Sequence, residues 1–207
     1  MLNKSLHKTL TVFLKLAMAS LAALLLAGPA SGQSQSQAIA AAVSPLPAVL
    51  RNGAAVVRLD ASGQPETLRD GTNGLVCIAD KPEDADFDVR CYRDSFIHVV
   101  YRKFQLKASG SSTTVGAEIA AGQLKLSNEP TAGFRCLGPT SIYDSSTNSV
   151  SGAEYCWESL HFPFRTAQEV GFPDMSEIPE NLRPTVPYIM ASGTYWAHVM
   201  IEHPSSK

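Results

Sequence analysis

The sequence lacks the short motifs by which common catalytic sites are recognised. It contains no G-x-S-x-G around a serine, no phosphate-binding loop, no G-x-G-x-x-G and no H-E-x-x-H. It also lacks a pair of cysteines two to four residues apart, the spacing that zinc sites favour. A catalytic triad can be assembled from residues far apart in the chain, so these absences disfavour an enzyme without excluding one.

Surplus positive charge and long hydrophobic runs are scarce as well. The 207 residues include 17 Lys and Arg against 19 Asp and Glu, with no basic stripe. A mildly acidic chain of this kind is not expected to bind nucleic acid or an anionic membrane. No long apolar run occurs after residue 27, so we expect no membrane association once the N-terminal segment is removed.

That N-terminal segment has the three-part layout of a secretory signal peptide. Residues 1–32 hold three lysines, then the uncharged run Leu16–Ala27, then a stretch of small residues. The run is shorter than the roughly 20 residues that span a bilayer, although an uncleaved N-terminal anchor is the alternative. We therefore expect an exported protein, periplasmic or extracellular. Removing residues 1–32 takes away three lysines and no acidic residue. The remaining 175 residues therefore carry a formal net charge of −5.

The rest of the chain predicts one domain of the α+β class. Residues 33–48 are rich in Gln, Ser and Ala and are expected to be a flexible leader, with a single globular domain over 49–207. Apolar residues at 96, 97, 100, 101 and 104 predict one substantial helix over about 93–107, although β-branched residues leave a strand open. The other elements are expected to be short strands, mainly antiparallel, at 55–59, 66–69, 75–78, 124–126, 133–137, 155–162, 188–190 and 196–201.

The four cysteines are expected to form disulfides, because export places them in an oxidising compartment. Four cysteines allow three pairings. Pairing Cys77 with Cys91 and Cys136 with Cys156 is favoured, since each pair brackets a segment that contains a turn. Zinc and a catalytic thiol are the less favoured alternatives.

An acidic segment lies between the first two cysteines. The run Asp84-Ala-Asp86-Phe-Asp88 imitates the start of a calcium-binding loop, but the sixth and twelfth positions hold Val89 and Ser95 instead of Gly and Glu. A solvated loop is therefore favoured. An irregular Ca²⁺ site at Asp84, Asp86 and Asp88 is the weaker alternative, and no other cofactor is expected.

Histidines and aromatic residues supply the remaining candidates. His198 lies in an apolar strand, which favours a core or edge position over a role as ligand or base, and His161 is the second candidate. Two aromatic groups occur, at 155–164 and at 188–196. Core packing is the favoured interpretation for both groups, and an exposed strip that binds sugar or peptide is the alternative.

Two patches resemble a family of uncharacterised bacterial exported proteins. One is Asp70-Gly-Thr-Asn-Gly-Leu-Val-Cys77-Ile-Ala-Asp80, followed by Cys91, and it is similar to the family's N-G-x-x-C-x-x-D segment. The other is His198-Val-Met-Ile201, similar to a C-terminal strand of that family. The resemblance implies an exported protein and supports pairing Cys77 with Cys91, but it implies no activity. Leu75 departs from the family's usual aromatic residue at that position.

Two hypotheses about function follow. The first is a non-enzymatic, disulfide-stabilised binding domain for a small ligand, a glycan or a protein. The alternative is an exported hydrolase or metal-dependent enzyme that uses His198 or His161 with nearby acids. A buried nucleophile and base at hydrogen-bond distance inside a pocket would favour the enzyme.

Overall fold

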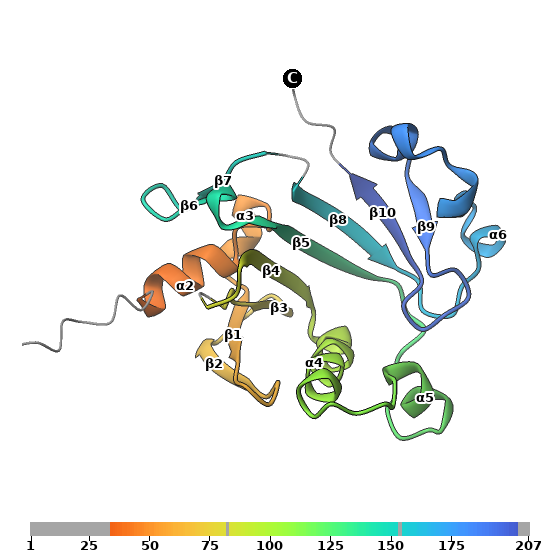
Figure 1. Ribbon diagram of the computed structural model, residues 1–207, viewed down its shortest axis with the longest axis horizontal. Coiled ribbons are helices and arrows are strands. Elements are labelled where there is room, and N and C mark those ends of the chain that lie inside the picture. The colour runs from red at the N-terminus through yellow and green to blue at the C-terminus, as the bar shows by residue number, and fades with distance from the viewer. Residues whose placement is uncertain (1–33, 82, 153–154, 203–207) are drawn as a thin grey trace, which may run out of the picture. The chain divides into compact units, whose positions relative to one another are not determined.

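An eight-stranded sheet forms the centre of the structure (Figure 1). The computed structural model describes residues 34–81, 83–152 and 155–202. The order of the strands across the sheet is β2-β1-β3-β4-β5-β8-β10-β9. Their bounds are β1 Ala55–Leu59, β2 Pro65–Arg69, β3 Leu75–Ile78, β4 Asp86–Arg93, β5 Thr131–Pro139, β8 Cys156–His161, β9 Tyr188–Met190 and β10 His198–Glu202, with β6 Tyr143–Asp144 and β7 Ser149–Val150 in a separate small sheet.

Helices cover parts of both faces of this sheet. The longest, α4, spans Asp94–Ala108, as the apolar spacing predicts. The others are α2 Gln35–Ala42, α3 Ala48–Arg51, α5 Val115–Ala120 and α6 Ala167–Val170, with 3₁₀ turns η2 Thr140–Ile142, η4 Met175–Glu177 and η5 Glu180–Thr185. The fold is therefore α+β, as expected, with a mostly antiparallel sheet.

One pair of strands departs from the expected antiparallel meander. Strands β1 and β3 run parallel, with Val56 opposite Cys77. The chain makes a hairpin from β1 to β2 at the sheet edge and then returns on the other side of β1. Residues 124–126, predicted as a strand, belong to no strand.

The flexible leader predicted for residues 33–48 is wrong over its described part. Residues 35–42 form helix α2, whose N-terminus is closed by a capping box between Ser34 and Gln37. Ala38, Ala41 and Ala42 are buried against the sheet. Alanine is the best helix former, and its small side chain allows close approach to the strands. The globular domain therefore includes residues well before position 49.

Strand alternation divides the sheet into two faces of different character. In β4, Phe87, Val89 and Cys91 are buried on the face that α2 covers. Tyr92 lies on the other face and packs against α4 residues such as Phe96. The α2 face thus holds apolar residues of β4, whereas the α4 face holds the polar residues between them.

Two disulfides cross neighbouring strands. Cys77 is bonded to Cys91 across β3 and β4, and Cys136 to Cys156 across β5 and β8. The pairing favoured from the sequence is therefore the one the structure has. Both bridges lie on the α2 face, since Cys91 and Cys136 alternate with the polar residues of their strands.

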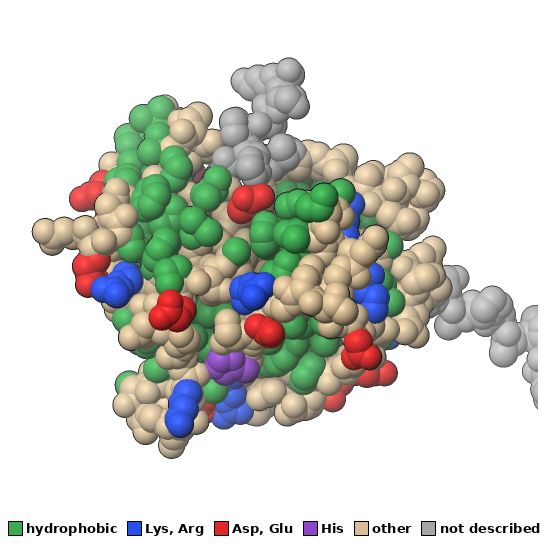
Figure 2. Space-filling view, turned by 180° about the vertical axis from the view of Figure 1, so that it is seen from behind, with side chains coloured by type: hydrophobic (Ala, Val, Ile, Leu, Met, Phe, Trp, Pro, Cys, Tyr) green, Lys and Arg blue, Asp and Glu red, His purple; other side chains and the backbone are tan. Residues whose placement is uncertain are grey.

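The predicted signal peptide, residues 1–32, lies outside the described residues. Within the described part of the chain, no helix has the length and apolar character needed to cross a membrane. Figure 2 shows that hydrophobic side chains on the rear surface gather toward the side where Figure 1 draws β8, β9, β10 and α6.

Candidate functional site

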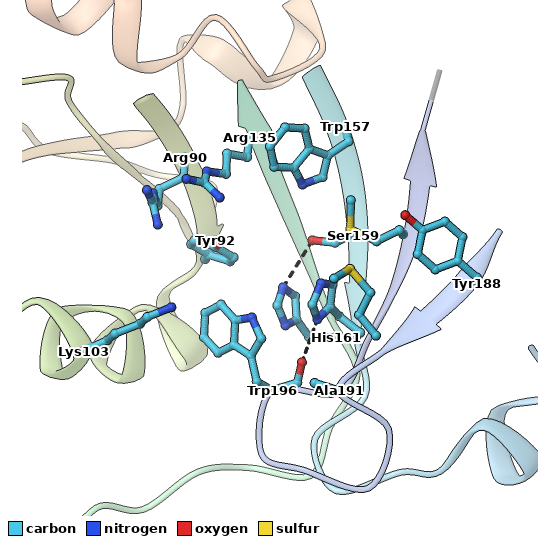
Figure 3. A pocket seen from close by; sticks show the side chains of 13 residues that line it. Arg90, Tyr92, Lys103, Arg135, Trp157, Ser159, His161, Tyr188, Ala191 and Trp196 are labelled. Atoms are coloured by element: carbon cyan, nitrogen blue, oxygen red, sulfur yellow. Dashed lines mark hydrogen bonds between the residues drawn. The ribbon is translucent and has the colours of Figure 1, made fainter. Parts of the chain in front are cut away.

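A cavity of about 510 Å³ lies between helix α4 and the polar face of strands β4, β5, β8, β10 and β9. The strand registers explain how it forms, because Arg90 faces Arg135, Arg135 faces Trp157, and His161 faces His198 across successive strands. Residues directly opposite on neighbouring strands point to the same face. The lining residues are Arg90, Tyr92, Lys103, Arg135, Trp157, Ser159, His161, Tyr188, Met190, Ala191, Trp196, His198 and Met200 (Figure 3).

Three cations stand on one side of the cavity, opposite Tyr188 (Figure 3). Each cationic group lies over an aromatic ring, as Lys103 does over Trp196 at 5.2 Å and Arg135 over Trp157 at 5.3 Å. Arg90 lies 5.2 Å from the centre of the Phe104 ring. Such contacts hold the cations in place, and all three side chains line the cavity.

Asp88 partly balances these charges. Arg135 donates two hydrogen bonds to its carboxylate, at 2.9 and 3.0 Å, and Arg90 forms an ion pair with the same group. Burial raises the pKa of Asp88, but the hydrogen bonds and charges of Arg135 and Arg90 outweigh it and lower the pKa below its usual value. One carboxylate thus serves two guanidinium groups.

The balance of charge at the cavity is positive. None of the described lining residues is Asp or Glu, and Lys103 forms no ion pair among the described residues. Partial desolvation lowers the pKa of Lys103, and the positive charges of Arg90 and Arg135 lower it further. A positive potential concentrated in a partly enclosed site favours a negatively charged ligand.

The two candidate histidines meet in this cavity. The rings of His161 and His198 are stacked with their centres 5.0 Å apart. Nδ1 of His198 lies 2.7 Å from the carbonyl oxygen of Trp196, and because a carbonyl only accepts, Nδ1 carries the proton. The hydrogen-bond partners of the two rings are a serine hydroxyl and a backbone carbonyl, not the nearby acids that the enzyme hypothesis expects.

His161 is the more deeply buried of the two. Its Nε2 lies 3.2 Å from Oγ of Ser159, and its Nδ1 is buried without a hydrogen-bond partner among the described residues. Burial, with a smaller effect from the charge of His198, lowers the pKa of His161 to about 3. Burial is also the main cause that lowers the pKa of His198, so both rings are neutral at neutral pH.

The distance between Ser159 and His161 therefore suits a nucleophile and its base. The protonation behaviour of His161 and the surroundings of its ring do not suit a base. A general base works best with a pKa near the working pH, and the pKa of about 3 makes His161 a weak base. No carboxylate partners its Nδ1 among the described residues, so nothing would stabilise an imidazolium.

The calcium alternative is not supported. The described residues contain no group of three or more His, Cys, Asp or Glu placed to hold a metal ion. The carboxylate of Asp88 faces Arg90 and Arg135, whereas Asp84 and Asp86 are exposed. Asp88 and Asp86 also belong to strand β4, not to the loop in which calcium ligands were expected.

The sequence pointed to His161 and His198 but missed the cations. Arg90 and Arg135 alternate with buried residues in their strands, which is the pattern of any half-exposed strand. Three residues of the two aromatic groups, Trp157, Tyr188 and Trp196, line the cavity. Trp196 also packs against the core, so it fits both the core interpretation and the binding-strip alternative.

No known protein family model matches this chain, and no curated protein and no solved structure is detectably similar to it. The cavity itself is therefore the evidence on which a function rests.

Proposed function

We infer that this protein is a non-enzymatic binding domain that works outside the cytoplasm and takes a small anionic ligand into the cavity between α4 and the sheet. The observation that carries this inference is the set of three cations, each over an aromatic ring, of which two pair with the carboxylate of Asp88 and Lys103 has no ion-pair partner among the described residues. The cavity volume of about 510 Å³ lies in the range of sites for small molecules.

The ligand chemistry follows from the lining. Guanidinium groups suit carboxylate, phosphate or sulfate groups, because their planar donors match two oxygen atoms at once. Nε and Nη2 of Arg135 donate to Asp88, so the ligand approaches its remaining nitrogen, Nη1, together with Arg90 and Lys103. Trp157, Tyr188 and Trp196 offer apolar surface to the rest of the ligand.

Helix α4 provides a matched pair of variants for the test. Lys103 lines the cavity, whereas Lys107 lies one turn further along the same helix and does not. We expect Lys103→Gln to weaken binding of inorganic phosphate, sulfate or a small organic carboxylate about threefold to tenfold, and Lys107→Gln to leave it unchanged. Isothermal titration at low and high salt measures both, and binding should weaken as salt rises.

Two results would contradict the proposal. Equal loss of binding in both lysine variants would indicate a general charge effect and not a site. Ester hydrolysis by the wild-type chain that is lost in Ser159→Ala would show that the hydrogen bond between Ser159 and His161 belongs to a catalytic site, the second candidate function.

A further inference from the structure

The β9–β10 side of the same cavity contains a different set of groups. Met190 on β9 is directly opposite His198 on β10, and Met200 lies two residues beyond His198 on the same face of the same strand. All three line the cavity. Residues opposite each other, or two apart on one strand, point to the same face, so both methionine side chains and the His198 ring enter the cavity from the same side.

His198 is held in the form that a metal ligand needs. Its Nδ1–H donates to the carbonyl oxygen of Trp196 at 2.7 Å, which leaves Nε2 unprotonated. A hydrogen bond from the second ring nitrogen to a backbone carbonyl is the usual way in which proteins orient a metal-binding histidine. His161 does not offer the same, because its Nε2 contacts Ser159 and its Nδ1 is buried.

The donor set is soft and uncharged. Thioether sulfur with imidazole nitrogen favours copper(I) and similar ions over Ca²⁺ or Mg²⁺. Thiolates cannot compete for such an ion, since all four cysteines are in disulfides. The neighbouring cations disfavour a divalent ion more strongly than a monovalent one, because Coulomb repulsion grows with the charge of the ion.

We propose that His198, Met190 and Met200 form a binding site for one soft monovalent metal ion, copper(I), at the β9–β10 side of the cavity. This site is separate from the anion-binding groups of the proposed function and does not depend on them. Trp196 lies beside it, with its ring centre 6.3 Å from that of His198.

The test uses silver(I) first and copper(I) second. Silver(I) has the same charge and ligand preference and is not redox-active here, so it spares the disulfides. Titration calorimetry with silver(I) gives the stoichiometry, and competition with a chromogenic copper(I) chelator under anaerobic conditions gives the affinity. We expect one ion per chain, with Zn²⁺ and Ca²⁺ failing to compete.

Variants identify the ligands. Met190→Leu and Met200→Leu should each weaken silver(I) binding at least tenfold, and Met175→Leu, in η4 outside the cavity, should not. His198→Asn removes Nε2 but keeps a donor near the Trp196 carbonyl, and it should also weaken binding at least tenfold. Wild-type affinity in both cavity methionine variants, or an equal loss in Met175→Leu, would overturn the proposal.

Lys103→Gln separates this proposal from the anion site. It should weaken anion binding but retain or strengthen silver(I) binding, because one repelling charge is removed. Failure of the wild-type chain to bind anions would count against the proposed function alone, and loss of metal binding in Met190→Leu with anion binding intact would support the metal site.

Discussion

His161 shows most clearly what a single residue does in this fold. It is 2% exposed and is surrounded by the rings of Tyr92, Phe96 and Trp196, at centre distances of 5.5, 4.6 and 5.1 Å. On its remaining sides it meets Ser159 and the ring of His198. These contacts give the ring no stabilising partner for a positive charge, so it is kept neutral.

The stability of the protein should therefore fall as the solution becomes acidic. The pKa of His161 is about 3 in the folded chain and 6.5 in the unfolded chain, so between these values the unfolded state binds more protons. Stability conferred by the neutral ring is present above pH 6.5 and is lost progressively as the pH falls toward 3, a cost of roughly 4 to 5 kcal/mol at the acid end.

Urea denaturation of wild type and His161→Gln over this pH range measures the effect. Gln keeps a polar group near Ser159 but cannot take up a proton, so its unfolding free energy should decline less steeply. His98→Gln is the control, because His98 lies outside the cavity and should follow the wild type. A parallel decline in His161→Gln would contradict the assignment to His161.

At the scale of elements, helices α2 and α4 serve opposite faces of the sheet. Ala41 of α2 packs with Phe87, Val89 and Cys136 and is itself fully buried. Helix α4 closes one side of the cavity with Lys103, and its Phe96 packs in the core beside the cavity residue Tyr92. The incomplete cover on the α4 face leaves room for the cavity.

Substitution in α2 tests whether this segment belongs to the core. Ala41→Asp places a charge against apolar side chains and should destabilise the fold by about 3 kcal/mol. Ser36→Asp, exposed in the first turn of the same helix, should change stability by less than about 0.5 kcal/mol. Chemical denaturation measures the unfolding free energy of both variants. Equal values would indicate that the segment is a flexible leader outside the core.

For the molecule as a whole, disulfides and site occupy opposite faces of one sheet. The bridges Cys77–Cys91 and Cys136–Cys156 tie β3 to β4 and β5 to β8 beneath α2. The cavity residues on β4, β5 and β8 are the alternate positions of the strands that the bridges join. The bridges thus support the strands of the cavity without taking part in it.

Removing either bridge should destabilise the whole domain. The closed loops have sequence separations of 14 and 20, for which the chain-entropy model gives about 3 kcal/mol each, slightly more for the longer loop. Double Cys→Ala variants, one for each bridge, can be compared by urea denaturation at pH 7. A bridge whose loss leaves the unfolding free energy unchanged would show that its strands are held by packing alone.

The sequence by itself determined the local elements. The helix predicted over about 93–107, the strands at 55–59 and 75–78 and the favoured pairing of neighbouring cysteines follow from periodicity, turn residues and spacing, and the structure confirms them. Periodicity and turn residues act over a few positions, and the favoured bridges join cysteines only 14 and 20 positions apart. The one long misreading, at residues 35–42, arose because a run of small residues indicates neither a core nor a loop until its partner surface is known.

Only the tertiary structure decided what those elements bring together. Arg90, Lys103, Arg135, His161 and His198 come from five separate elements and meet through strand order and register. Register is set by packing and backbone pairing between distant segments, and a shift of one residue in a strand would turn its arginine or histidine to the other face of the sheet. The candidate site is therefore a property of the assembled sheet, and no single stretch of the chain contains it.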